Sequence, residues 1–321
     1  MSETIREFAV ISRAEFLLPN LGSLIMGLAW GANTSLSLSE MVISVALSFA
    51  IINLSSAIGA QVNTISDYSL DLKDDRKKGL VQALDKFGQN RLKQVMIVEF
   101  VATLALIVVL TSAKAKPVFL LLWLAGISLG CLYSAPPLRI KSRSWLAPVT
   151  LALVLAVFPI LFAYFAFTPE LNPLFLLALA GLASTVYGVI IPTEIRDYFG
   201  DKAMNIKTMT VRLGLAKASL LSITLLGLGG TLIGGAFFVT FIYGQYPVLS
   251  LSVLAIAAAD AIVLRKLKRL YTLSKEYEYS SRNPVDKEIV SFSADNPNWI
   301  MLVTQTYSII SVLMLASKFL H

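Results

Sequence analysis

The chain has 321 residues, of which 56% are hydrophobic and only 15% are charged, and its mean hydropathy is +0.72. A water-soluble domain of this length is normally less apolar, so the composition excludes that class and indicates a polytopic membrane protein. The formal net charge is +7, a value that nucleic-acid-binding proteins also reach. The only cysteine is Cys131, which excludes an intramolecular disulfide.

Apolar segments recur along the whole chain and are separated by polar segments. A helix that crosses a bilayer needs roughly 20 predominantly apolar residues. Nine segments approach or exceed this length, so the predicted fold class is an all-α, polytopic membrane protein formed by one domain, residues 1–321. The predicted spans are residues 16–31, 41–62, 94–112, 118–133, 145–167, 174–192, 219–243, 248–264 and 299–316.

The basic residues predict the orientation of these spans. All of the 27 lysines and arginines except Lys114, Lys116 and Lys318 fall on the side of the membrane that also carries the N-terminus. The cytoplasmic side of a membrane protein is enriched in Lys and Arg, so this side is predicted to be cytoplasmic and the C-terminus to lie outside. The net charge is therefore a topology signal, and no nucleic-acid partner is expected.

Two acidic motifs lie where a predicted span meets a cytoplasmic segment. Asn63, Asp67 and Asp71 follow the second span, and Asp197 and Asp201 follow the sixth. Carboxylates spaced four residues apart share one face of a helix, so each motif can present oxygen ligands toward one point. Hard cations such as Mg²⁺ bridge carboxylates to substrate phosphates. The motifs therefore predict a membrane enzyme that acts on a diphosphate.

The spans repeat with an offset of about 130 residues. This shift carries residues 14–143 approximately onto residues 144–273, and it carries Asp67 and Asp71 onto Asp197 and Asp201. Each unit has four spans, so both copies face the same way and are related by a pseudo-twofold axis along the membrane normal. This axis would place the two acidic faces opposite each other across a central cavity. The ninth helix, residues 299–316, stands outside the repeat.

Two further segments lie near the motifs. Tyr133-Ser-Ala-Pro-Pro-Leu-Arg139-Ile-Lys141 follows the fourth span, and Arg196-Asp197, Lys207-Thr208 and Val211-Arg212-Leu213-Gly214 follow the sixth. Together with the acidic motifs, these segments resemble the UbiA superfamily of intramembrane prenyltransferases over nearly the whole chain. A four-spaced aspartate pair is common, but the combination at these helix ends is specific.

The resemblance implies an Mg²⁺-dependent transfer of a prenyl group, of the geranylgeranyl type, from its diphosphate to a lipophilic acceptor. The acceptor could be an aromatic quinone precursor, a chlorin or haem-like acid, or a glycerol-phosphate lipid, and the sequence does not choose among them. Two Mg²⁺ ions are expected. The expected metal ligands, which are also catalytic candidates, are Asn63, Asp67, Asp71, Asp197 and Asp201.

Charge and aromatic character suggest the remaining site residues. Basic side chains neutralise the diphosphate as it leaves, and aromatic faces stabilise the allylic cation. The diphosphate candidates are Arg139, Lys141, Arg196, Lys207 and Arg212. The aromatic candidates are Tyr133 as a catalytic residue and Tyr68 and Tyr198 as substrate-binding residues. Phe158, Phe162 and Phe165 are candidates to line an apolar groove that opens to membrane lipid.

Other interpretations stay open at this point. Either motif could be the solvated face of a cytoplasmic helix. Internal repeats and acidic helix ends also suit an ion-coupled secondary transporter, although that class predicts carboxylates near the bilayer midplane. A membrane scaffold would leave the repeated ligands unexplained. In the enzyme, segments 63–93 and 193–218 are expected to cap the cavity from the cytoplasmic side.

Overall fold

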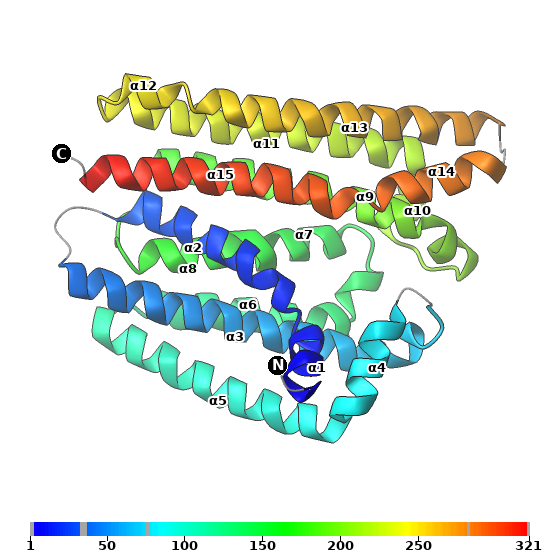
Figure 1. Ribbon diagram of the computed structural model, residues 1–321, viewed down its shortest axis with the longest axis horizontal. Helices are drawn as coiled ribbons and strands as arrows, with labels where there is room; N and C mark the ends of the chain where they lie inside the picture. The colour runs from blue at the N-terminus through cyan, green and yellow to red at the C-terminus, as the bar shows by residue number, and fades with distance from the viewer. Residues whose placement is uncertain (1–2, 33–36, 75–76, 281–282, 320–321) are drawn as a thin grey trace.

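The computed structural model describes residues 3–32, 37–74, 77–280 and 283–319, and its regular structure in these ranges is helical (Figure 1). The helices, in chain order, are α1 (Glu3–Ile11), η1 (Ala14–Phe16), α2 (Leu17–Gly31), α3 (Leu38–Asp71), α4 (Lys78–Phe87), α5 (Gln89–Lys114), α6 (Val118–Ser134), η3 (Ile140–Ser142), α7 (Leu146–Ala152), η4 (Leu153–Val157), α8 (Phe158–Phe165), α9 (Pro173–Ala203), α10 (Met209–Leu213), α11 (Leu215–Tyr243), α12 (Pro247–Ser250), α13 (Val253–Ser280), α14 (Asn283–Ser293) and α15 (Asn296–Phe319).

The helices are long and apolar enough for a polytopic membrane protein. Seven helical segments of the described chain meet the length and hydropathy of a membrane span, or eight if the bent pair of α1 with η1–α2 counts as one span. α6 is apolar but has only 17 residues. Each of the nine predicted segments overlaps a helix. The all-α membrane class is therefore confirmed, whereas the count of nine stays a prediction.

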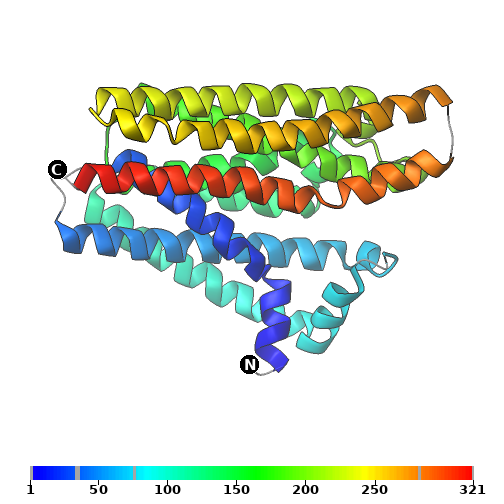
Figure 2. The ribbon, with the colours of Figure 1, turned by 45° about the horizontal axis from the view of Figure 1, so that its top comes forward.

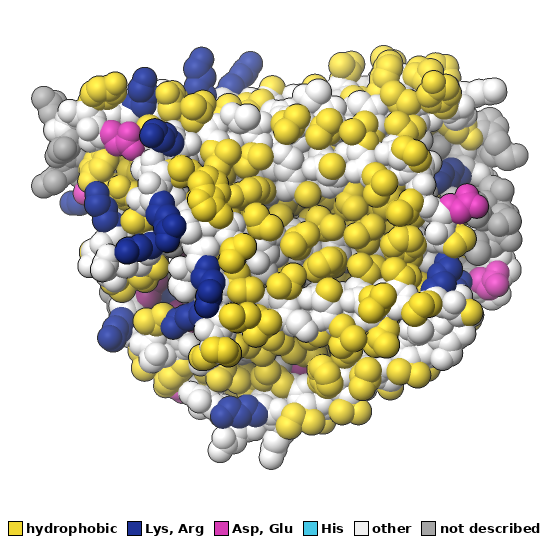
Figure 3. All heavy atoms as spheres, turned by 180° about the vertical axis from the view of Figure 1, so that it is seen from behind, with side chains coloured by type: hydrophobic (Ala, Val, Ile, Leu, Met, Phe, Trp, Pro, Cys, Tyr) yellow, Lys and Arg dark blue, Asp and Glu magenta, His cyan; other side chains and the backbone are white. Residues whose placement is uncertain are grey.

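The surface of the protein is apolar around its middle. Viewed from behind, hydrophobic side chains cover the central part of the face, and most lysines and arginines gather toward one end (Figure 3). Ile97, Val98 and Leu121 are 64%, 67% and 65% exposed. Apolar area on this scale is costly in water but matches the hydrocarbon of a bilayer. The protein is an integral membrane protein.

The order of the helices repeats along the chain. α2, α3, α5 and α6 are followed by α7–α8, α9, α11 and α12–α13, and α15 comes last. α3 and α9 both run toward the right end in Figure 1, so the acidic ends of these two helices lie at the same end of the bundle. The described C-terminal end of α15 lies at the opposite end, as Figure 2 also shows.

A small cap covers part of the end at which α3 finishes. α1 packs on α4, and both lie beside the start of α5 (Figures 1 and 2). Ile11, Leu84, Phe87 and Leu92 form an apolar cluster between these elements, with Phe8 packed against it. This apolar contact holds α1 and α4 together at the end of the bundle where α3 finishes.

The bundle is tightest where α9 packs on α11. A Cβ atom on Gly229 of α11 would lie 2.3 Å from the Thr185 Oγ1 atom and 2.6 Å from the Gly181 carbonyl oxygen of α9. Small residues let the backbones of membrane helices approach closely, which maximises van der Waals contact. The close approach therefore depends on glycine at this position.

We expect Gly229→Ala to lower the apparent melting temperature of the purified protein, because the added methyl group forces two helix backbones apart. The matched control is Gly235→Ala on the same helix, where an added Cβ meets no atom within 4 Å. Thermal unfolding in detergent compares the two variants. Equal melting temperatures would contradict the role of Gly229 in the α9–α11 contact.

Candidate active site

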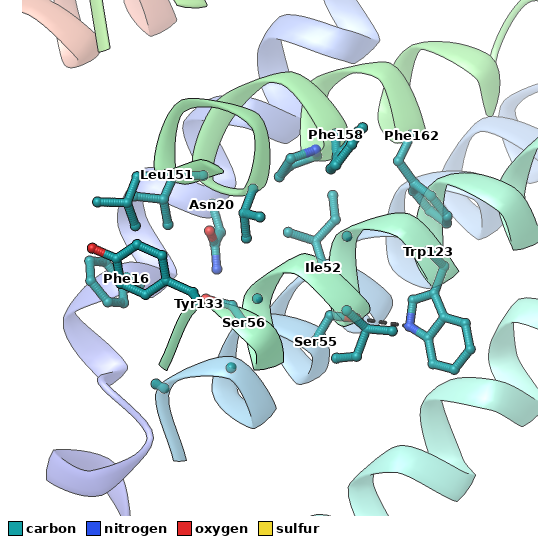
Figure 4. Close-up of a pocket in the computed structure, with 18 of the residues that line it drawn as sticks. Phe16, Asn20, Ile52, Ser55, Ser56, Trp123, Tyr133, Leu151, Phe158 and Phe162 are labelled. Carbon is teal, nitrogen blue, oxygen red and sulfur yellow. Dashed lines mark hydrogen bonds between the residues drawn. The ribbon is translucent and has the colours of Figure 1, made fainter. Parts of the chain in front are cut away.

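An elongated cavity of about 270 Å³ lies between α2, α3, α6 and the α7–α8 segment. Its polar lining includes Arg13, Asn20, Asn63 and Tyr133, and most of its wall is apolar. Figure 4 shows Phe16 and Tyr133 at one end and Trp123 with Phe162 at the other. Phe158 and Phe162 line the cavity as predicted, whereas Phe165 packs into the hydrophobic clusters instead.

The first acidic motif lies at the polar end of this cavity. The Ser134 hydroxyl at the end of α6 donates a hydrogen bond to Asn63 Oδ1, and Asn63 itself lines the cavity. Asp67 lies one helical turn further along α3 and is only 7% exposed. Asp71 lies another turn along α3, near the positive charges of Lys77, Lys141 and Arg13. The motif thus runs from the cavity to the end of the helix.

Two basic side chains hold the buried Asp67. Arg139 Nη2 donates to Asp67 Oδ1 at 3.1 Å, and Lys141 Nζ donates to Asp67 Oδ2. Both come from the loop after α6, in which Arg139 has a left-handed backbone with φ of 40°. Such a φ is costly for a non-glycine residue, and the ion pair offsets part of that cost. Burial lowers the pKa of Lys141, while Asp67 acts in the opposite direction.

The second acidic motif lies near the end of α9. The Arg196 guanidinium donates through Nε and Nη2 to the two oxygens of Asp197, at 3.1 Å and 3.2 Å. Glu194 Oε2 accepts from the backbone N–H and the hydroxyl of Thr210, at 3.2 Å and 3.0 Å. Asp197 and Asp201 lie close enough to Glu194 for their charges to interact with it, so three acidic groups share this part of α9.

Two features connect the motifs. Tyr133 lines the cavity from α6 and lies close enough to Asp67 of α3 and Glu194 of α9 to interact with both charges. An isolated parallel β-bridge joins Ser144 to Thr208, so the loop that carries Lys141 lies beside the loop that follows α9. The structure therefore brings the loop after α6 and the loop after α9 together at one end of the bundle, next to the cavity mouth.

Two of the predicted site residues, both tyrosines, pack away from the cavity, and two basic ones are exposed. The Tyr68 hydroxyl donates to Asp85 at 2.7 Å, and its ring packs against the cap cluster. Tyr198 is buried in the core beside Phe199 and accepts a hydrogen bond from Lys202. Lys207 and Arg212 are exposed on the segment after α9. A functional role for these four residues stays a prediction.

Sequence reasoning overlooked Arg13 and Glu194. Glu194 precedes Asp197 by three residues, and that spacing places both on the same face of α9, so helical periodicity alone could have found it. Arg13 could not be found in this way. It reaches the cavity mouth because the chain bends by 64° between α1 and the helix that follows.

The five predicted metal ligands do not form one cluster. Within the residues that the structure describes, no group of three or more His, Cys, Asp or Glu side chains is placed to hold a metal ion. Both oxygens of Asp67 are bound to basic side chains instead. Joint metal binding by the two motifs therefore stays a prediction.

The fold and the site define a helical integral membrane protein in which an apolar cavity ends beside acidic and basic side chains. The sequence matches the UbiA prenyltransferase family over residues 20–279. The chain belongs to this family, whose members are enzymes that transfer prenyl groups. The predicted family and the prediction of an enzyme are thus confirmed. None of the curated proteins matches the sequence.

Solved structures share the fold at low sequence identity. A structure from work on digeranylgeranylglyceryl phosphate synthase in membranes has a TM-score of 0.65 and 13% identity, and the match covers 97% of this chain and 100% of that one. A UbiA homologue from Archaeoglobus fulgidus has a TM-score of 0.61 and 19% identity, with 98% of each chain covered. The same homologue bound to GPP and Mg²⁺ has a TM-score of 0.61 and 16% identity, covering 97% and 99%.

Proposed function

We propose that the protein transfers a prenyl group from a prenyl diphosphate to a lipophilic acceptor and releases diphosphate. The observation that carries this proposal is the apolar cavity of about 270 Å³ that begins beside Asn63 and Tyr133. The cavity is mostly apolar and has polar residues at one end. A prenyl diphosphate likewise has an apolar tail and a highly charged head. The tail would occupy the cavity, and the head would lie near Asp67, Arg139 and Lys141.

The residues at the mouth fit a divalent cation such as Mg²⁺. Asn63, Asp67, Asp71, Asp197 and Asp201 offer only oxygen ligands, which hard cations prefer. Asp67 now pairs with Arg139 and Lys141, so a bound cation would replace or share these contacts. The solved UbiA homologue binds GPP with Mg²⁺, and in another structure DMAPP with Mg²⁺, which supports a divalent cation here. We propose two such ions. A bound cation would neutralise charge on the leaving diphosphate.

The side chains of the protein supply the rest of the proposed mechanism. The bond between the allylic carbon and the diphosphate oxygen breaks, a bond from that carbon to the acceptor forms, and the acceptor loses a proton. Lys141, Arg139 and Arg196 stabilise the negative charge that builds on the diphosphate. Tyr133 offers an aromatic face to the allylic cation, and the apolar wall excludes water that would capture it.

The proposed acceptor is a lipophilic molecule from one of three classes. An aromatic quinone precursor, a chlorin or haem-like acid and a glycerol-phosphate lipid are the three candidates. The similarity to a structure from work on digeranylgeranylglyceryl phosphate synthase supports including the glycerol-phosphate lipid. Family membership favours an enzyme over an ion-coupled transporter.

The proposed architecture is one domain of nine spans, built from two four-helix repeats and a ninth helix around the cavity. The repeated order of helices supports it, with α15 outside the repeat. The proposed orientation places the N-terminus, the cap and both acidic motifs in the cytoplasm and the C-terminus outside. The lysines and arginines at one end of Figure 3 support that orientation.

We expect the purified protein to convert a labelled prenyl diphosphate into a lipophilic product only when Mg²⁺ is present. The assay offers geranyl, farnesyl and geranylgeranyl diphosphates with each acceptor class in detergent. Removing divalent cations with EDTA should abolish product formation, and adding Mg²⁺ back should restore it. Absence of product with every pair, together with no Mg²⁺-dependent binding of any prenyl diphosphate, would overturn the proposal and favour the transporter.

A further inference from the structure

One face of α6 forms a wall of the cavity along its whole depth. Trp123, Gly126, Gly130 and Tyr133 all line the cavity, and their spacing of three or four residues places them on one side of the helix. The two glycines lie between the two aromatic residues. A Cβ at Gly126 would meet only Phe158, at 3.7 Å, and a Cβ at Gly130 would meet Val154 at 3.7 Å. Because neither glycine carries a side chain, space stays open between Tyr133 and Trp123.

Trp123 closes this space at its inner end. The indole Nε1–H donates to Ser55 Oγ at 3.1 Å (Figure 4). Ser55 Oγ in turn donates to the Ile51 carbonyl at 2.7 Å. On its other side the indole lies against Phe100 of α5, with 5.4 Å between ring centroids. Trp123 is only 4% exposed. It is therefore held between α3 and α5 by a hydrogen bond and an aromatic contact.

A second aromatic pair strengthens the closed end. Phe162 lines the cavity from α8 and contacts Phe119 edge-on, with ring centroids 5.3 Å apart. Phe119 is fully buried. A chain that passed beyond Trp123 would have to displace well-packed aromatic side chains, which costs contact energy.

The depth of the cavity can be compared with the length of a prenyl chain. Tyr133 and Trp123 are ten residues apart on α6, which corresponds to about 15 Å along the helix. An extended polypeptide advances about 3.5 Å over three covalent bonds, so one isoprene unit, with four bonds along its chain, advances roughly 5 Å. The space between Tyr133 and Trp123 thus holds about three units.

We propose that Trp123, held in place by Ser55, is the specificity-determining residue that limits the prenyl chain to about three isoprene units. This inference rests on the proposed function, since it assigns the cavity to the prenyl tail. It favours geranyl and farnesyl diphosphates over the geranylgeranyl donor expected from the sequence. A longer tail fits only if the indole moves.

Two substitutions on α6 should shift the preferred length of the prenyl donor in opposite directions. Trp123→Ala removes the closed end, so kcat/KM for geranylgeranyl diphosphate relative to geranyl diphosphate should rise by about tenfold or more. Gly126→Leu fills the middle of the cavity, so the ratio of farnesyl to geranyl diphosphate should fall by a similar factor. Ser55→Ala frees the indole and should shift the ratio in the direction of Trp123→Ala by a smaller factor. Leu121→Ala, on the lipid-exposed side of α6, is the control and should leave both ratios unchanged.

The outcomes separate this inference from the proposed function. If the wild type turns over prenyl diphosphates but the ratios are the same in Trp123→Ala, Gly126→Leu and the control, Trp123 does not limit the chain. If the wild type neither converts nor binds any prenyl diphosphate, the proposed function itself fails. Should Trp123→Ala not fold, Gly126→Leu still decides, because its Cβ meets Phe158 only at van der Waals distance and its side chain extends into the cavity. An unchanged farnesyl-to-geranyl ratio would overturn the inference.

Discussion

Asp67→Asn is expected to lower prenyl transfer by about 10²- to 10³-fold, the size of effect seen when a charge-stabilising group is removed from an active site. Asp67 is the buried carboxylate at the cavity mouth, and it positions both Arg139 and Lys141. Asparagine keeps the size of the side chain but removes its charge, which weakens its interaction with these two groups and with the proposed Mg²⁺. Single-turnover assays at saturating donor and Mg²⁺ would measure the loss.

The matched control for Asp67→Asn is Glu288→Gln. Glu288 of α14 also forms an ion pair, with Arg269 of α13 at 3.1 Å, but both side chains of this pair are exposed. Ion pairs of this kind contribute little, so activity and melting temperature should both stay unchanged. If Asp67→Asn remains folded and retains full activity, the assignment of the active site to this end of the cavity is wrong.

Lys141→Met is expected to lower stability as well as activity, because it leaves the buried Asp67 carboxylate with Arg139 as its only ion-pair partner among the contacts described. Breaking a fully buried pair typically costs 3–5 kcal/mol, and the partial exposure of Lys141 and the remaining Arg139 reduce this to about 1–3 kcal/mol. Activity should also fall, because Lys141 is proposed to stabilise the leaving diphosphate. Thermal unfolding and the transfer assay measure the two effects separately.

The double variant Asp67→Asn/Lys141→Met distinguishes structural from catalytic effects. Removing the charge of Asp67 should recover much of the stability lost in Lys141→Met, since the unpaired carboxylate no longer exists. Activity should not recover. The control is Lys86→Met. Lys86 is itself exposed and pairs with Glu3 and, at 3.8 Å, with Glu7, so its removal should leave the melting temperature nearly unchanged. Additive losses of stability in the double variant would show that Asp67 and Lys141 are not coupled.

Local patterns in the sequence predicted much of this protein. Runs of apolar residues predict membrane spans because their side chains match the hydrocarbon of the bilayer. These spans are helical because the bilayer core has no water to pair with backbone groups. The four-residue spacing placed Asp67 with Asp71, and Asp197 with Asp201, on shared helix faces. The same periodicity places Tyr68 and Tyr198 on other sides of their helices than Asp67 and Asp197. Each directly follows its aspartate, so it points to a different side of the helix, toward the cap or the core.

Other features depend on contacts between distant segments. Arg139 and Lys141 are 72 and 74 residues from Asp67, and only the loop after α6 brings them to it. Exposure of Lys207 and Arg212 depends on how the segment after α9 folds. Nothing in the spacing of Ser55 and Trp123 predicts their hydrogen bond across 68 residues.

By itself, the sequence determined an all-helical membrane protein of the UbiA type with two acidic motifs at helix ends. Helical periodicity and hydropathy are local properties, so residues close in the chain suffice to predict them. Only the tertiary structure decided the cavity, its closed end at Trp123 and the pairing of Asp67 with basic side chains. A cavity is the space that several packed helices leave unfilled, and its shape depends on which side chains meet across them.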